Sequence, residues 1–536
     1  MKLKTLCAMI DCSRNAVMTV DALRKFIPML SRMGYNAMML YTEDTYEIKE
    51  YPFFGYMRGR YSADELRQID ALAAENGMEL IPCIQVLGHL EMALKWDFLP
   101  KESRDILLPD DERSYEFIDR AFRTMSECIA SRRIHVGLDE AFGLGCGELL
   151  KKNGYESSVS IIKRHLQRVK RIADKYGYTL LAWSDMFFTE WNGGNYWIDK
   201  TEVPREVIES VPEGVVPVYW DYYSMDYNRY DAMLFNHSQL SDEIWFEGGI
   251  WGWRGMAPYN NFSVNTMTPA LDACEKNGAE NIIMCMWGDD GNECSRYSLL
   301  PALYYVAKYA RGERDMEEIK RGFEKEFVVP YDTFCLIDEL NRPDNPDFGR
   351  RDMNPSKYML YSDPFNGFRD CFATEESEGF YAALAEKLYD AAEKYPEWRE
   401  LFKSHGSLSE LLSKKYGLGI KTRRAYRAGD KTAISRIVSE CYEPLLTLIP
   451  DYLESFRAVW DKENKPFGFD LQDIRIGGLI QRIKSCRDRL IGYIEGRIDS
   501  IPELCDEALP AEDIHIRYGK WRSGAYLFTP NVFQGI

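Results

Sequence analysis

Two adjacent carboxylates, Asp139 and Glu140, are the residues of this chain with the clearest potential for chemistry. They close the segment Arg133–Glu140, in which an apolar, strand-like run leads into the acids, and glycines follow at 143, 145 and 147. At the carboxyl end of a barrel strand, paired acids lie where active sites are built and are candidates for acid–base work. Because the chain has 85 acidic residues, a solvated edge is the simpler explanation of one such pair. The rest of the chain must decide between the two.

Other strand-like runs end on aromatic and charged residues. The apolar face of a sugar ring stacks on aromatic planes, and its hydroxyls bind charged or bidentate partners. Any one of these residues could simply cap a barrel, but together they predict a carbohydrate site. The candidates are Arg14, Glu43, Asp44, His89, Trp183, Trp220, Asp221, Tyr222, Trp251, Trp253, Trp287 and Asp289.

Eight apolar runs alternate with helical patterns over the first 312 residues. Strands are expected at Thr5–Ile10, Ala37–Tyr41, Glu79–Val86, Ile134–Leu138, Tyr178–Trp183, Val215–Tyr219, Glu243–Phe246 and Asn281–Met286. Helices are expected at Val20–Met33, Ala63–Asn76, Tyr115–Ala130, Ser158–Tyr176 and Thr268–Asn277. Left-handed caps are expected at Gly34, Gly77, Gly177 and Gly278. The alternation predicts an α/β fold, a (β/α)8 TIM barrel. The alternative is a doubly wound open sheet, although no GxGxxG follows the first strand.

The sequence changes character after residue 312. We expect a barrel over 1–312, a linker or ordered excursion over 313–370, and an all-α C-terminal domain over 371–536 with an aromatic tail from Ala508. Expected helices are Phe380–Tyr395, Leu408–Tyr416, Ile420–Arg427, Lys431–Ile449, Asp451–Asn464 and Ile474–Ile498. The glycine-bearing stretch Asn464–Gly478 is expected to be a loop. It is a candidate for a homodimer interface or a wall of the substrate cleft, and packing against the barrel is the simpler alternative.

Composition narrows the class of protein. With 67 basic and 85 acidic residues, a net charge of −18 and no basic run, nucleic acid and membranes are poor partner candidates. The apolar run at the start of the chain ends at Asp11, which makes it too short for a secretory signal. The 13 scattered cysteines are typical of a protein with reduced thiols, so a cytoplasmic location is expected. With six histidines and no ligand spacing, no metal and no cofactor are expected.

Five segments taken together resemble glycoside hydrolase family 20, the exo-β-N-acetylhexosaminidases. His135–Glu140 resembles the family's His-x-Gly-Gly-Asp-Glu signature, and Asp11-x-Ser13-Arg14 resembles its first-strand motif. Gly88-His89, Ala182-Trp183 and Cys285–Asp289 resemble motifs at strands three, five and eight. The C-terminal part is similar to that of compact bacterial members.

The resemblance implies a retaining, substrate-assisted reaction on terminal N-acetylhexosamines of oligosaccharides or glycoconjugates. Glu140 would be the general acid, Asp139 would orient the acetamido group and stabilise its charge, and Tyr222 would bind the acetamido carbonyl. Arg14 and Asp289 would fix the non-reducing end. The residues that would support the acids or line the sugar site are His89, His135, Trp183, Trp220, Asp221, Trp251 and Trp287.

Several positions depart from the family pattern. Leu138 replaces the second glycine of the signature, Leu87 replaces a proline, and Asp289 replaces a commoner glutamate. Strand seven lacks a clear Tyr-x-Asp/Asn, so Tyr222 is chosen from the Tyr219–Tyr223 cluster. Two rivals stay open: a barrel glycosidase that uses Asp221 as a second carboxylate, and a carbohydrate-binding barrel without catalysis.

Overall fold

Eight parallel strands form a closed barrel in the computed structural model, which describes residues 2–343, 354–367 and 376–507. The strands pair in chain order, and β8 pairs with β1 to close the barrel. They are β1 (Thr5–Asp11), β2 (Ala37–Thr42), β3 (Glu79–Ile84), β4 (Arg133–His135), β5 (Thr179–Trp183), β6 (Val215–Trp220), β7 (Trp245–Gly249) and β8 (Asn281–Met286). The predicted (β/α)8 barrel is thereby confirmed, and the open doubly wound sheet is excluded.

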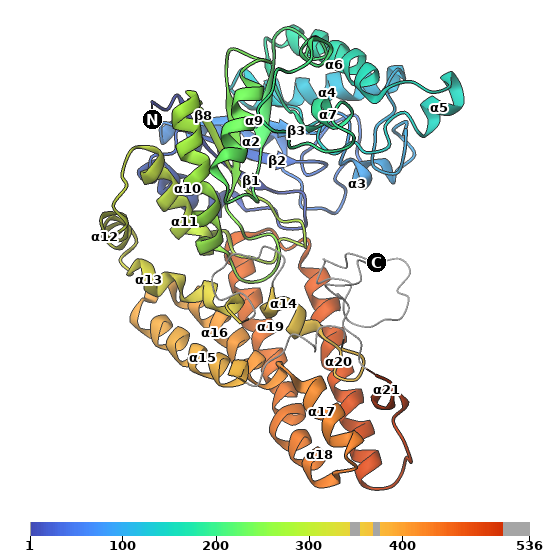
Figure 1. Cartoon of the computed structure of the whole chain (residues 1–536), viewed down its shortest axis with the longest axis vertical. Helices are drawn as coiled ribbons and strands as arrows, with labels where there is room; N and C mark the ends of the chain where they lie inside the picture. Colours follow the sequence, from blue (N-terminus) through green and yellow to red (C-terminus); the bar gives the residue numbers. More distant parts are fainter. Residues whose placement is uncertain (1, 344–353, 368–375, 508–536) are drawn as a thin grey trace. The chain divides into compact units, whose positions relative to one another are not determined.

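Helices lie around these strands in Figure 1. They are α1 (Val20–Met33), α2 (Ala63–Glu75), α3 (Glu91–Leu94), α4 (Glu112–Cys128), α5 (Glu148–Asn153), α6 (Ser158–Lys175), α7 (Asp185–Thr189), α8 (Arg205–Ile208), α9 (Tyr227–His237), α10 (Asn260–Asn277) and α11 (Leu300–Ala310). The next helix along the chain is α12 (Met316–Phe327). The four predicted cap glycines all have positive φ, between 68° and 114°.

Local sequence explains where the first helices begin. Thr19 accepts a hydrogen bond from the backbone of Ala22 at the start of α1. Ser62 and Glu65 form a reciprocal capping box at the start of α2. Helices α1, α4 and α6 each bury one mainly apolar stripe, while strands such as β1 and β8 are buried along their whole length. Strands covered on both faces read as continuous apolar runs, which is why the sequence revealed them.

Strands β4 and β7 differ most from their predicted carboxyl ends, and both differences affect the site. Strand β4 stops at His135 instead of Leu138, because φ is +73° at Gly137 and +86° at Leu138. These left-handed angles cannot continue a strand. Strand β7 runs on to Gly249, past the predicted end at Phe246. It therefore contains Glu247.

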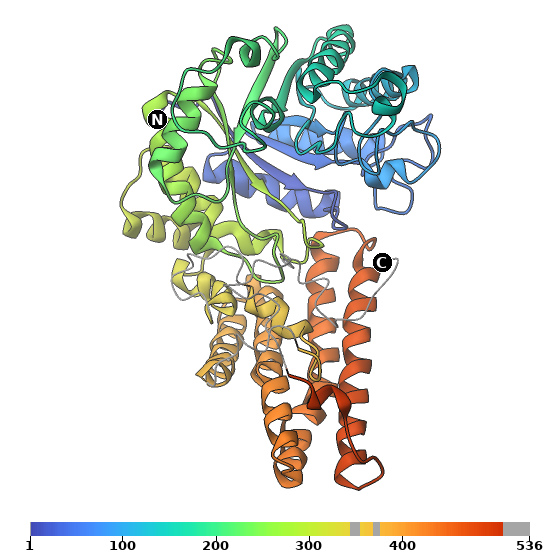
Figure 2. The same cartoon turned by 45° about the vertical axis from the view of Figure 1, so that its right-hand side comes forward.

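The described residues form two compact units. The first comprises residues up to 250 with 263–287 and 302–319, and the second comprises 251–262, 288–301 and residues from 320 onward. The second unit contains helices α13 (Tyr331–Phe334), α14 (Pro355–Tyr361), α15 (Glu376–Lys394), α16 (Arg399–Lys415), α17 (Leu418–Arg427), α18 (Lys431–Ile437), α19 (Glu443–Glu463), α20 (Phe469–Ile494) and α21 (Pro502–Cys505). Its long helices run alongside one another in Figure 2, with α15 packed on α16, α16 on α19 and α19 on α20. The domain boundaries drawn from the sequence stay predictions.

Several predicted boundaries in this unit were wrong; α16, for example, begins at Arg399, where Leu408 was expected. The helix α19 continues through Pro450, where a break was expected, and a π-helical turn, Val438–Tyr442, precedes it. The expected loop Asn464–Gly478 is short, because α20 already begins at Phe469. The aromatic tail from Ala508 lies outside the described residues.

A buried ion cluster holds part of the second unit together. The Glu293 side chain is fully buried, with Oε2 at 2.6 Å from Lys357 Nζ and Oε1 at 2.9 Å from Arg475. Arg475 belongs to α20, within the stretch expected to be a loop. The segment that follows β8 is thereby fixed to helices α14 and α20.

Candidate active site

The acid pair lies on a tight turn after β4. Two residues of the turn besides Gly137 have left-handed backbone angles: φ is +86° at Leu138 and +48° at Glu140. A Cβ at position 137 would lie 2.0 Å from Oε1 of Gln85, so only glycine fits there. A non-glycine residue in the left-handed region costs on the order of 1–2 kcal/mol. Such strain clusters at functional sites, where the surrounding structure holds it in place.

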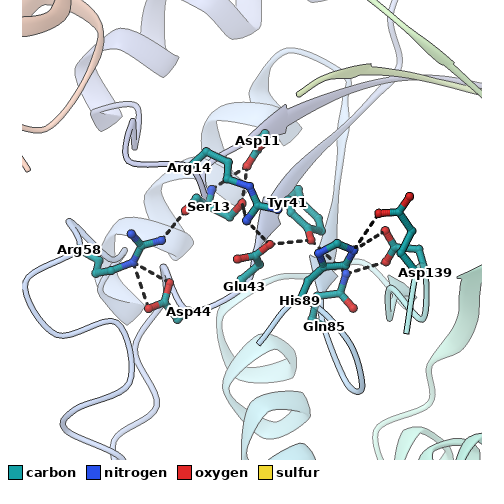
Figure 3. A network of polar contacts seen from close by, with 11 residues as sticks. Asp11, Ser13, Arg14, Tyr41, Glu43, Asp44, Arg58, Gln85, His89 and Asp139 are labelled. Carbon is teal, nitrogen blue, oxygen red and sulfur yellow. Dashed lines mark hydrogen bonds and ion pairs between the residues drawn. The ribbon is translucent and has the colours of Figure 1, made fainter. Parts of the chain in front are cut away.

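The carboxylate of Asp139 is held between a neutral donor and a cation (Figure 3). Gln85 Nε2 donates to Oδ1 at 2.9 Å, and His89 Nε2 lies 3.1 Å from Oδ2. Burial alone would raise the pKa of Asp139, but the charge and hydrogen bond of His89 outweigh it and hold the pKa below its ordinary value. Burial likewise lowers the pKa of His89, yet Asp139 brings it to about 10. Asp139 is therefore an anion and His89 a cation at neutral pH.

Glu140 has the opposite electrostatic environment. Partial burial and then the charge of Asp139 raise its pKa, while His89 and Arg14 act in the other direction. Its side chain is still 46% exposed, so the carboxyl group can be approached from solvent. The turn thus presents an anion beside a carboxyl group that holds its proton to higher pH.

Asp185, which is not among the predicted site residues, fixes this turn from within the barrel unit. It is fully buried at the start of α7, and its Oδ2 accepts from the backbone N of Glu140 at 2.9 Å. Its Oδ1 accepts from Trp220 Nε1 at 3.2 Å. Burial and then the charge of Asp139 raise the pKa of Asp185 to about 7. Asp185 thereby connects the turn that carries Asp139 and Glu140 to the indole ring of Trp220.

Four aromatic side chains from β5, β6 and β8 gather near these acids. Trp220 stacks on Tyr222 with ring centroids 5.3 Å apart and planes at 17°. Trp183 and Trp287 have centroids 5.6 Å apart, and Tyr222 meets Trp287 edge-on at 6.5 Å. The structure therefore brings together Trp183, Trp220 and Trp287, three of the rings that the sequence nominated for a carbohydrate site.

Glu247 is a buried carboxyl group that the sequence analysis missed. Its Oε2 accepts from Trp183 Nε1 at 2.9 Å, and its Oε1 lies 2.9 Å from the hydroxyl of Tyr222. Burial, only partly offset by these hydrogen bonds, raises its pKa to about 8. The available signal was one acid inside the apolar run Trp245–Gly249, hidden because the strand was expected to end earlier.

A polar chain connects Arg14 to the acid pair (Figure 3). Arg14 lies 2.5 Å from Oε1 of Glu43, which also accepts from the hydroxyl of Tyr41 at 3.1 Å. Gln85 Nε2 donates to Tyr41 Oη at 3.0 Å as well as to Asp139. Arg14 remains 31% exposed. The guanidinium is thus oriented by buried groups and keeps an open side for a ligand.

Asp221 is directed away from the aromatic cluster. Its fully buried carboxylate lies 2.8 Å from Arg229 of α9 and accepts from the hydroxyl of Tyr219 at 3.3 Å. Consecutive residues of an extended segment point to opposite sides, so Trp220 and Tyr222 face the rings while Asp221 faces the helix layer. We therefore leave Asp221 out of the substrate contacts. The rival mechanism that needs Asp221 as a second carboxylate is disfavoured for the same reason.

His135 supports the turn and does not reach solvent. Its ring is fully buried against Trp183, with centroids 4.2 Å apart, and its Nδ1 accepts from the backbone N of Gly137 at 3.2 Å. Burial lowers its pKa to about 3, so the ring is neutral. A direct substrate contact, as the sequence suggested, does not fit a side chain with no exposed surface.

Trp251 and Asp289 belong to the second unit. Trp251 is fully buried and stacks on Trp253 with centroids 4.0 Å apart, whereas Asp289 is exposed. The roles assigned to Trp251 and Asp289 stay predictions.

Within the described part of the chain, no three His, Cys, Asp or Glu side chains are grouped so that they could hold a metal ion. The helices over the same residues include none with the length and apolar character needed to span a membrane.

Two family models match the chain. Residues 7–202 match the catalytic domain of glycosyl hydrolase family 20, and residues 332–517 match the Glycoside Hydrolase 20C C-terminal domain. Among curated proteins, hexosaminidase D of Bos taurus is 27% identical over 276 residues, which is 48% of this chain and 72% of that protein. Hexosaminidase D of Homo sapiens is 26% identical over 228 residues, covering 39% of this chain and 43% of that protein. The chain thus spans less than half the length of this second relative.

The chain also has some similarity to solved structures. A GH20 exo-β-N-acetylglucosaminidase from Vibrio harveyi, in complex with N-acetylglucosamine, is 19% identical with a TM-score of 0.47, covering 63% of this chain and 59% of that chain. The β-N-acetylhexosaminidase from Bacteroides fragilis is 18% identical with a TM-score of 0.47, covering 61% and 70%.

Proposed function

The chain belongs to glycoside hydrolase family 20 and is a glycoside hydrolase, and we propose that it is a retaining exo-β-N-acetylhexosaminidase. In this proposal it removes terminal, non-reducing β-linked N-acetylhexosamine from oligosaccharides or glycoconjugates. One observation carries the proposal. Two consecutive carboxyl groups on one turn have opposite pKa shifts, Asp139 downward and Glu140 upward.

In the first step the acetamido carbonyl oxygen of the substrate attacks C1 as the bond from C1 to the leaving oxygen breaks. Glu140 gives its proton to that oxygen, and its raised pKa favours the protonated form that this step needs. Asp139, kept anionic by His89, accepts the acetamido N–H and stabilises the positive charge of the forming oxazolinium ion. The protein supplies no nucleophile.

In the second step water adds to C1 and opens the oxazolinium ion. The carboxylate of Glu140 takes the proton from that water and is restored for the next cycle. Two displacements at C1 return the sugar with its original β configuration. Consecutive residues suit this division of work, because Asp139 and Glu140 point in different directions.

The remaining groups would bind the terminal sugar. Trp183, Trp220 and Trp287 offer aromatic planes for the ring and the acetamido methyl. Arg14, oriented by Glu43, has an exposed guanidinium suited to vicinal hydroxyls. These contacts would restrict cleavage to the non-reducing end.

Matched aryl β-glycosides of GlcNAc, GalNAc and glucose, each measured with and without a GlcNAc-thiazoline, test this proposal. Cleavage confined to the N-acetyl sugars and blocked by the thiazoline would support substrate assistance, and the ratio between the two sugars would give the O4 preference. Equal cleavage of the glucoside, unaffected by the thiazoline, would require a protein nucleophile and overturn the roles of Asp139 and Glu140.

A further inference from the structure

Tyr222 faces a conflict between two acceptors. Its hydroxyl carries one proton, and that proton can be donated to only one partner at a time. The hydroxyl lies 2.9 Å from Oε1 of Glu247, an acceptor if Glu247 is ionised. The proposed function, however, needs the same proton for the acetamido carbonyl oxygen. An ionised Glu247 would therefore compete with the substrate for Tyr222.

The second oxygen of Glu247 indicates how the conflict is resolved. Oε2 already accepts from the indole N–H of Trp183 at 2.9 Å, and an indole can only donate. If Glu247 is protonated, the proton therefore belongs on Oε1, which faces Tyr222. The 2.9 Å separation suits a hydrogen bond donated from either side. Trp287 also hydrogen-bonds to the Tyr222 hydroxyl, necessarily as the donor.

The surroundings of Glu247 favour its neutral form. The side chain has no exposed surface, and no Lys, Arg or His among the described residues forms an ion pair with it. The titratable groups that act on it are Asp139, Tyr222 and the thiols Cys7, Cys83 and Cys285 of strands β1, β3 and β8. Burial raises its pKa to about 8, and the Asp139 anion contributes in the same direction.

We propose that Glu247 stays protonated in the working enzyme and donates its O–H to Tyr222, which frees the Tyr222 hydroxyl to donate to the acetamido carbonyl oxygen. Tyr222 then accepts from Glu247 and Trp287 and gives its own proton to the substrate. Glu247 is a positioning residue, since it acts through Tyr222 and Trp183. This inference rests on the proposed function and adds a pH limit to it.

The limit appears when Glu247 ionises. Above its pKa the Glu247 carboxylate takes the hydrogen bond from Tyr222, and the acetamido oxygen loses its donor. With half-ionisation at about pH 8, some nine-tenths of the enzyme would be in this form at pH 9, so kcat/KM should fall about tenfold there. Glu140 would not produce the same decline with an activated aryl leaving group, which departs without protonation.

The decisive variant is Glu247→Gln, because glutamine copies the neutral carboxyl group: its NH2 donates to Tyr222 and its oxygen accepts from Trp183. We measure kcat/KM for an activated aryl β-N-acetylglucosaminide from pH 6.5 to 9. Glu247→Leu should lose about 10²–10³-fold at pH 6.5, the usual effect of disrupting one oriented donor. Glu247→Gln should keep most of the wild-type kcat/KM at pH 6.5, and its kcat/KM should not decline toward pH 9. A decline identical to that of the wild type would overturn the proposal.

A second variant keeps the test independent of whether position 247 tolerates change. Tyr222→Phe removes the hydroxyl with which an ionised Glu247 would form a hydrogen bond. In this variant kcat/KM should therefore be low but constant between pH 7 and 9. A Tyr222→Phe enzyme that still declines like the wild type would contradict the inference. Titration of GlcNAc binding to the wild type gives a readout without turnover, and affinity that does not weaken between pH 7 and 9 would also contradict it.

The two failures are distinguishable. If the wild type does not hydrolyse the N-acetylated glycosides at pH 6.5, the proposed function fails. If it hydrolyses them but Glu247→Gln keeps the wild-type pH profile, only the role of Glu247 fails.

Discussion

Replacing His89 by asparagine tests whether the positive charge of His89 keeps Asp139 ionised. His89 has φ of +54°, and asparagine tolerates this left-handed backbone better than most residues, so the charge is removed with little added strain. Asp139 keeps Gln85 as a donor at 2.9 Å but loses its cation at 3.1 Å. Burial of Asp139 is then opposed only by hydrogen bonds such as that from Gln85 and no longer by the charge of His89, so the pKa of Asp139 should rise.

The pKa of His89 bounds the size of this effect. It lies at about 10 against an ordinary value of 6.5, a difference of about 3.5 units or roughly 5 kcal/mol at 1.36 kcal/mol per unit. The side chains of His89 and Asp139 remain 22% and 13% exposed, so solvent screening reduces that bound. A single opposite charge at this range commonly shifts a carboxyl pKa by about 1–3 units. We expect the acid limb of kcat/KM to move to higher pH by that amount.

The same pair makes stability depend on pH. Because the pKa of His89 is raised in the folded protein, its stabilisation is complete below pH 6.5 and is lost as the pH rises toward 10. Because the pKa of Asp139 is lowered, its stabilisation is present above pH 3.8 and is lost as the pH falls below that value. Thermal unfolding should therefore separate wild type from His89→Asn more at pH 6.5 than at pH 10.

The assay is kcat/KM for an activated aryl β-N-acetylglucosaminide across the acid limb. The matched control is Gln85→Met, which removes a neutral donor from the same carboxylate without changing the charge and should shift the limb less. An acid limb that stays in place in His89→Asn, in a protein that remains folded, would refute the assignment of Asp139 as an anion maintained by His89.

Three further predictions concern the acids, the turn and the second unit. Glu140→Gln should lose activity mainly on poor leaving groups, whereas Asp139→Asn should lose about 10²–10³ on activated aryl glycosides as well; near-normal rates for Asp139→Asn on both would sink the assignment. Gly137→Ala should lower the free energy of unfolding by about 1–3 kcal/mol and reduce activity, since its Cβ would lie 2.0 Å from a glutamine oxygen. Gly143→Ala, with φ of +90° but open space, is the matched control, and equal losses in denaturant titration would show that the contact is unimportant. Glu293→Ala leaves two buried cations unpaired and should destabilise the second unit by about 3–5 kcal/mol in the same titration; no change would contradict the buried cluster.

Much of the barrel could be predicted because its strands are buried on both faces. Strands β1, β2 and β8 lie within one residue of their predicted bounds, since an uninterrupted apolar run ends where burial ends. Strand β4 was predicted too long, because nothing in the side chain of Leu138 reveals a φ of +86°. The family signature that His135–Glu140 resembles has glycine at this position, and the sequence analysis noted the departure without inferring a turn from it.

Single residues of the site could be predicted from the sequence, but the hydrogen bonds and ring contacts between them could not. Asp139, Glu140 and Tyr222 were nominated because they follow apolar runs, but partners such as Asp185 are fixed by tertiary contacts that one sequence does not show. Glu247 was missed because the strand was expected to end at Phe246, one residue before the acid, whereas β7 continues to Gly249. A lone acid inside a strand of a closed barrel is the signal to look for.

The most direct test of the central claim uses substrates whose acetamido group is progressively fluorinated. Fluorine withdraws electrons from the carbonyl oxygen, so an acetamido nucleophile weakens with each atom added, while a protein nucleophile would not. The account predicts that kcat/KM of the wild type on activated aryl glycosides falls steeply and continuously from the acetamido to the trifluoroacetamido substrate. A rate that is unchanged across the series would contradict substrate-assisted catalysis by Asp139 and Glu140.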